Sequence, residues 1–91
     1  MTDDSIRVLA VTPYEAATIV QYALEIGRYT GIRIPVPYEE AREVLVKENC
    51  DKGYVTRAVW YRTTNVLLIR VKKNKHGFAV IKALSCKYKV I

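Results

Sequence analysis

The hydrophobic pattern of the first third of the chain predicts a strand followed by a helix. Residues 6–11 (IRVLAV) form a short apolar run, which is typical of a buried strand. Thr12 and Glu15 have the spacing of a capping box, and Pro13 suits the first helical position. Apolar residues then recur every three or four positions, which predicts a helix to about Tyr29. The predicted buried face comprises Ala16, Ile19, Val20, Ala23 and Gly27, with Leu24 and Ile26 beside them.

The polar side of this helix carries three aromatic side chains, which are Tyr14, Tyr22 and Tyr29. Tyrosine is enriched at interfaces because its ring buries a large area while its hydroxyl group keeps a polar partner. Two interpretations stay open. The rings cover neighbouring segments of the same chain, or they form the contact face of a homo-oligomer.

A second helix is predicted over residues 38–49, after an extended segment at 32–37 that contains two prolines. Prolines restrict such a segment to an edge strand or a connector. The helix carries a charged outer face, which is typical of a solvated surface. Four of the chain's acidic residues lie on it, so we expect it to face away from a phosphate backbone.

From residue 53 onwards the pattern changes to one that favours strands. Residues 54–64 and 66–72 are rich in β-branched and aromatic side chains, and residues 63–65 are predicted to form a turn. The Asn74-to-Gly77 reversal predicts a hairpin, after which residues 78–85 would form another strand. The hairpin register stays open, since a slip of one residue exchanges the two faces.

These elements together predict a single α+β domain over residues 1–91. A short N-terminal strand and two helices would pack on an antiparallel β-meander of three to four strands. The alternative is a winged helix, with residues 55–64 as the recognition helix and the lysine-rich reversal as the wing. The β-branched content of residues 55–64 argues against that alternative.

Charge divides this chain sharply. Residues 1–51 hold five basic and all nine acidic residues, a net charge of −4, whereas Lys52 to Ile91 hold ten basic residues and no acidic one. Such asymmetry favours a polyanionic partner, with nucleic acid first and a membrane surface second. The basic half is also rich in apolar residues, so we expect it to be folded rather than a disordered tail.

Several other classes of function find no support in the sequence. The acidic start MTDDSIRVLAV is unlike a signal peptide, and no apolar run is long enough for membrane insertion, so a cytoplasmic protein is expected. Cys50 and Cys86 lack the spacing of a zinc site and are predicted to be buried thiols. No phosphate-binding loop or metal-binding carboxylate pair occurs, so the sequence assigns no cofactor, no metal and no catalytic residue.

Two clusters in the basic half have the chemistry of a nucleic-acid interface. Like charges crowded around residues 72–76 repel one another, and a phosphate backbone would supply the missing counter-charge. In residues 57–62, alternation places an arginine beside an aromatic ring on either face of the strand, which suits base stacking. Trp60 is expected in the core and Tyr61 at the surface. The predicted nucleic-acid-binding residues are Arg57, Tyr61, Arg62, Arg70, Lys72, Lys73, Lys75, His76 and Lys82.

The predicted order of elements resembles two known families at the level of topology. The strand-helix-strand-helix-strand-strand series resembles the Alba chromatin proteins, although Val11-Thr12-Pro13 stands where those proteins carry a pair of lysines. The two helices followed by a meander resemble the RelE-type ribonuclease toxins. Shared topology does not imply shared function, so neither resemblance assigns a role to a residue.

The sequence therefore predicts a small nucleic-acid-binding protein that forms a homodimer and makes largely sequence-independent phosphate contacts from its C-terminal β-hairpin region. One alternative is a small ribonuclease of RelE-like topology that uses His76 or Tyr88. Another is an interaction module in which the acidic half of one copy meets the basic half of the next. DNA and RNA are not distinguished.

Overall fold

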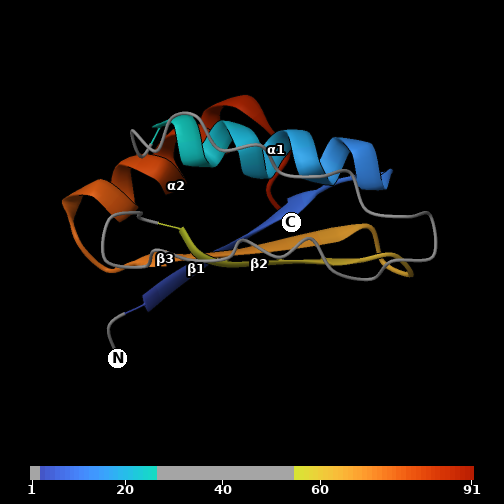
Figure 1. Cartoon of the computed structure of the whole chain (residues 1–91), viewed down its shortest axis with the longest axis horizontal. Helices are drawn as coiled ribbons and strands as arrows, with labels where there is room; N and C mark the ends of the chain where they lie inside the picture. Colours follow the sequence, from blue (N-terminus) through green and yellow to red (C-terminus); the bar gives the residue numbers. More distant parts are fainter. Residues whose placement is uncertain (1–2, 27–54) are drawn as a thin grey trace.

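Five elements make up the part of the chain that the structure describes. A computed structural model describes residues 3–26 and 55–91. Its elements, in chain order, are β1 (Asp3–Leu9), α1 (Pro13–Ile26), β2 (Val55–Tyr61), β3 (Val66–Lys72) and α2 (Lys75–Lys87). The strands form one antiparallel sheet in the order β1-β3-β2, and both helices lie on one of its faces (Figure 1). The predicted α+β class and a sheet of three strands are confirmed.

The core lies between the sheet and the two helices. Alternation along β3, the central strand, turns Leu67, Ile69 and Val71 towards the helices, and all three are fully buried. The buried residues of α1 repeat at helical spacing and agree with the predicted stripe. They are Ala16, Ala17, Ile19, Val20, Ala23 and Leu24.

The start of α1 follows the capping signal in the sequence. The Thr12 hydroxyl oxygen accepts a hydrogen bond from the Glu15 backbone N–H at 3.0 Å, which satisfies one of the unpaired donors of the first turn. The Glu15 carboxylate accepts from the Val11 N–H at 3.4 Å, one residue before the position that a capping box would use.

The prediction for the C-terminal segment is wrong, because residues 75–87 form a helix and not the second strand of a hairpin. The Asn74 side chain accepts hydrogen bonds from the backbone N–H groups of His76 and Gly77, at 3.0 and 2.9 Å, and so caps α2. A Cβ atom on Gly77 would overlap the Lys72 carbonyl oxygen, so only glycine lets the helix begin this close to β3. The Asn-to-Gly signal therefore marks a strand-to-helix connection.

The winged-helix alternative is also wrong, since Val55–Tyr61 is a strand paired along β3. The predicted turn after it is confirmed: the Thr64 N–H donates to the Tyr61 carbonyl at 3.2 Å. Asn65 closes the turn with a φ of 59°, a left-handed conformation that asparagine tolerates better than most residues.

The C-terminal residues pair with the outer edge of β1. Val90 forms an antiparallel bridge with Val8, and the Leu9 N–H donates to the Lys89 carbonyl at 2.9 Å. The Ile91 N–H donates in turn to the Arg7 carbonyl at 2.9 Å. The end of the chain thus protects part of an edge that would otherwise expose unpaired backbone groups.

Several predictions lie outside the described residues, including the end of the first helix at Tyr29, the helix over residues 38–49, and Cys50. Cys86 is described, and the prediction that it is buried is wrong, because it lies exposed on α2. Within residues 3–26 and 55–91, neither helix has the length and apolar character needed to cross a membrane.

Candidate nucleic-acid interface

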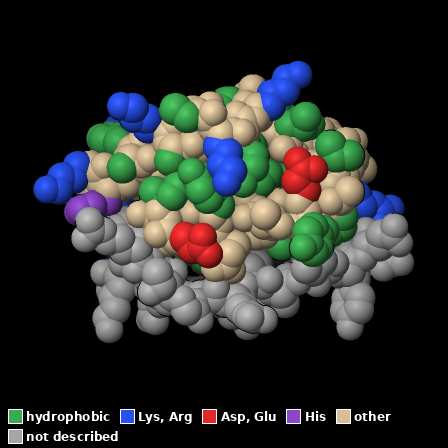
Figure 2. Space-filling model, turned by 90° about the horizontal axis from the view of Figure 1, so that it is seen from above, with side chains coloured by type: hydrophobic (Ala, Val, Ile, Leu, Met, Phe, Trp, Pro, Cys, Tyr) green, Lys and Arg blue, Asp and Glu red, His purple; other side chains and the backbone are tan. Residues whose placement is uncertain are grey.

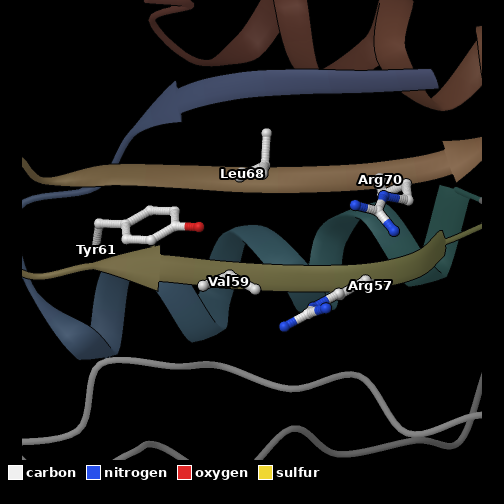
Figure 3. A pocket seen from close by; sticks show the side chains of 5 residues that line it. All are labelled: Arg57, Val59, Tyr61, Leu68 and Arg70. Carbon is white, nitrogen blue, oxygen red and sulfur yellow. The ribbon is translucent and has the colours of Figure 1, made fainter.

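The face of the sheet opposite the helices carries a shallow hollow lined by cations, an aromatic ring and aliphatic side chains. The hollow has a volume of about 130 Å³, and its lining, shown in Figure 3, comes only from β2 and β3. We call this surface the outer face and define it by the lining residues Arg57, Val59, Tyr61, Leu68 and Arg70.

Strand register brings the members of the outer face together. Arg57 is the direct partner of Arg70, and Val59 is the partner of Leu68. Tyr61 follows at the end of β2, with 46% of its surface exposed. The hollow therefore has an aliphatic floor, made of Val59, which is 6% exposed, and the half-buried Leu68. This floor lies between the exposed Tyr61 and the two exposed arginines.

The two arginines make the outer face strongly basic. Side chains at directly opposed strand positions lie about 5 Å apart at Cβ, and like charges in such a pair destabilise the sheet. No acidic residue occurs after Asp51, so β2 and β3 supply no counter-charge to Arg57 and Arg70. An anion bound at the outer face would relieve this repulsion.

Arg7 is a further cation at this face that the sequence did not single out. It is exposed on β1 and is the register partner of Leu68, which places it diagonally beside Arg70. Alternation between buried Ile6, exposed Arg7 and buried Val8 already indicated its side of β1. Its place next to β3 depends on the strand order, which the local pattern does not reveal.

A second basic group lies where β3 ends and α2 begins, and we call Lys72, Lys73, Lys75 and His76 the end cluster. Lys72 has the same strand parity as Arg70, so the end cluster continues the outer face. The N-terminus of α2 adds the positive end of a helix dipole, and its first turn has no acidic residue. β1 places Asp3 in register with Lys72, so an acidic position lies beside this end of the sheet.

The predicted nucleic-acid-binding residues do not all share one surface. Arg57, Tyr61 and Arg70 gather on the outer face, and the end cluster adjoins them. Arg62 lies in the turn at the other end of β2, and Lys82 lies exposed on α2, in the helix layer. Figure 2 shows the helix layer, where basic side chains stand apart among hydrophobic, neutral and acidic ones.

The two aromatic residues at the end of β2 have the roles expected of them. Trp60 is only 1% exposed, and its indole N–H donates to the Ala10 carbonyl oxygen at 2.8 Å inside the core. Tyr61, the next residue, points to the opposite face and is exposed. Of the two, Tyr61 is the ring available to a ligand.

The predicted interface tyrosines differ in their surroundings. The Tyr22 ring packs edge-on against Tyr88, with 5.7 Å between centroids, and the Lys87 ammonium lies 4.1 Å from the centre of the Tyr22 ring. Tyr22 thus covers a neighbouring segment of its own chain. Burial raises the pKa of Tyr88, and the nearby Tyr22 and Glu15 raise it further. Tyr14, in contrast, is 68% exposed at the start of α1.

The two side chains that the ribonuclease alternative names are far apart in the structure. His76 and Tyr88 lie at opposite ends of α2, and a rise of about 1.5 Å per residue separates them by about 18 Å along the helix. Within residues 3–26 and 55–91, no three His, Cys, Asp or Glu side chains are grouped as a metal site would require. The outer face has the chemistry of a binding surface.

Comparison of the chain with protein-family models, with curated proteins and with solved structures gave no match in any of the three sets.

Proposed function

We propose that this protein binds nucleic acid without catalysis and with little sequence preference, through the outer face and the adjoining end cluster. The observation that carries the proposal is the direct register of Arg57 with Arg70, on strands that hold no acidic residue. The exposed Arg7 and the partly exposed Lys72 extend this cationic surface across β1 and along β3.

The physical basis of binding is electrostatic: Arg57 and Arg70 repel each other in the free protein, and each would pair with a phosphate in the complex. A guanidinium group presents planar, parallel N–H donors that match two phosphate oxygens, so Arg57 and Arg70 suit bidentate phosphate contacts. Binding also releases the cations condensed on the nucleic acid, which makes the affinity strongly dependent on salt. Phosphate contacts carry no sequence information, so DNA and RNA are both suitable ligands.

The proposal is tested by fluorescence anisotropy with a labelled mixed-sequence oligonucleotide over a range of salt concentrations. Six lysines and arginines lie on the outer face, on the adjoining β1 and in the end cluster: Arg7, Arg57, Arg70, Lys72, Lys73 and Lys75. If each meets one phosphate, the affinity should fall roughly 300- to 2,000-fold between about 50 and 200 mM salt. An affinity that does not change with salt would contradict the proposal.

Matched variants locate the binding surface. Arg57→Gln and Arg70→Gln should each weaken binding and reduce the slope of log affinity against log salt by roughly one. Lys82→Gln removes the same charge from the helix layer and should leave the slope unchanged. Equal losses in all three variants would indicate attraction by net charge alone and would reject the outer face as the site.

The proposed assembly is a homodimer. Support comes from Tyr14 and Val11, which are 68% and 56% exposed close to the start of α1. They lie where β1 connects to α1, so a contact there leaves the outer face open to nucleic acid. Exposed aromatic rings of this kind are enriched in protein interfaces.

A further inference from the structure

We infer that the outer face binds single-stranded nucleic acid, with one base stacked on Tyr61 and the phosphates of the same strand at Arg57 and Arg70. This inference rests on the proposed function and adds the class of nucleic acid that the surface accepts. It starts from the composition of the outer face, which combines an aromatic ring, an aliphatic floor and guanidinium groups within one hollow (Figure 3).

The chemistry of this hollow matches the two parts of a nucleotide. Val59 and Leu68 form an apolar floor, and the Tyr61 ring lies on the same side of the sheet as both guanidinium groups (Figure 3). A base has a flat apolar surface that stacks on an aromatic ring, whereas its phosphate requires a cation. Phosphate contacts alone would need neither the exposed ring nor the apolar floor.

The spacing along β2 allows one strand of nucleic acid to reach both parts. Tyr61 and Arg57 are four residues apart on one face, which corresponds to about 13 Å along the strand. A base on Tyr61 and a phosphate at Arg57 would therefore belong to different positions of a strand that crosses the hollow. Arg70 lies directly beside Arg57 and would hold the same part of the backbone.

A duplex cannot use this combination of groups. In a duplex the faces of the bases are covered by their neighbours, so the Tyr61 ring has no base on which to stack. The major groove admits a helix or a two-stranded ribbon, whereas Tyr61 lies on the broad face of a three-stranded sheet. A duplex would contact the cations alone and should bind more weakly for the same number of phosphates.

The test compares labelled single strands with duplexes of the same sequence, using the wild-type protein and two variants at Tyr61. Tyr61→Leu keeps an apolar side chain but removes the ring, and Tyr61→Phe keeps the ring. We expect Tyr61→Leu to weaken single-strand binding by about 5- to 150-fold, since one stacked base contributes an amount of this order. Tyr61→Phe should retain single-strand affinity within about twofold.

Two controls separate stacking from loss of fold and from charge. Thermal unfolding should show that Tyr61→Leu remains folded, because the residue is exposed. The same variant should keep the wild-type salt slope, since its ring meets no phosphate, and should bind duplex as the wild type does. Arg57→Gln should change the salt slope with both ligands.

The possible failures of the two proposals are distinct. If single strands and duplexes bind equally and Tyr61→Leu has no effect, the inference is overturned, while a slope that depends on Arg57 would still support nucleic-acid binding. If the protein binds neither ligand at low salt, both proposals fail together.

Discussion

At the scale of single residues, Trp60 joins the two described segments of the chain, residues 3–26 and 55–91. Its ring fills the core beneath β2, and its N–H donates to the Ala10 carbonyl, which lies just after β1. Ala10 is itself fully buried, so this carbonyl has no access to water. One side chain thus fills volume and satisfies a backbone group fifty positions away in the sequence.

Trp60→Phe should lower the free energy of unfolding by about 2–4 kcal/mol. The change removes part of a large buried ring and leaves the Ala10 carbonyl without its donor. Urea unfolding followed by circular dichroism measures the loss. Tyr61→Phe is the control, because that residue is exposed, and its effect should stay within about 0.5 kcal/mol. Equal effects of the two substitutions would refute the role given to the Trp60 hydrogen bond.

At the scale of elements, α2 shows how a local signal can serve two structures. A short reversal from an asparagine to a nearby glycine between two apolar runs favours a hairpin, and residues 74–77 fit that pattern. Gly77, Val80 and Leu84 also have helical spacing, and they are the buried residues of α2. The helix is favoured by the Asn74 cap, and the absence of a side chain on Gly77 lets the helix approach the Lys72 carbonyl closely.

Gly77→Ala tests that explanation, because the two effects of the substitution change the stability of the protein in opposite directions. Intrinsic helix propensity alone would make alanine more stable than glycine by about 1 kcal/mol. The overlap with the Lys72 carbonyl predicts the reverse, a loss of about 1–3 kcal/mol, because the helix must shift away from β3. Thermal or urea unfolding distinguishes the two. A stabilised variant would show that α2 does not need this close approach.

At the scale of the whole molecule, the charge asymmetry along the sequence does not separate the helix layer from the sheet. The structure gives α2 several basic residues, so the helix layer carries both signs of charge (Figure 2). The outer face is formed by β2 and β3, and neither of these strands carries an acidic side chain. Nucleic-acid binding is therefore proposed for that face and not for the whole basic half.

Self-association is a separate property of the whole molecule and has its own prediction. If Tyr14 forms the contact, Tyr14→Ser should raise the dimer dissociation constant at least about fivefold, because buried interface tyrosines contribute more than about 1 kcal/mol. Light scattering of nuclease-treated protein measures this change.

Tyr61→Ser, on the outer face, is the matched control for Tyr14→Ser and should leave the dimer intact. A contact between the acidic half of one copy and the basic half of another would instead weaken as salt rises. A protein that is monomeric at every concentration would contradict the proposed dimer.

The sequence alone determined the properties that depend on neighbouring residues. The Thr12 cap and the apolar stripe of α1 could be predicted because capping and helical periodicity depend on residues only a few positions apart in the sequence. Alternation in residues 57–61 likewise separated the faces of Trp60 and Tyr61. These features were predicted from the pattern and are present in the structure.

Only the tertiary structure decided which distant residues meet. The order β1-β3-β2 brings Arg7 beside β3, and the register opposes Arg57 to Arg70. Neither fact follows from local periodicity, because pairing depends on burying the helix-side residues of all three strands in one core. The same packing turned the segment after Lys72 into α2, through a backbone contact that glycine alone permits. The sequence thus predicted a basic half, and packing gathered Arg57 and Arg70 of that half with Arg7 on one face, beside the exposed ring of Tyr61.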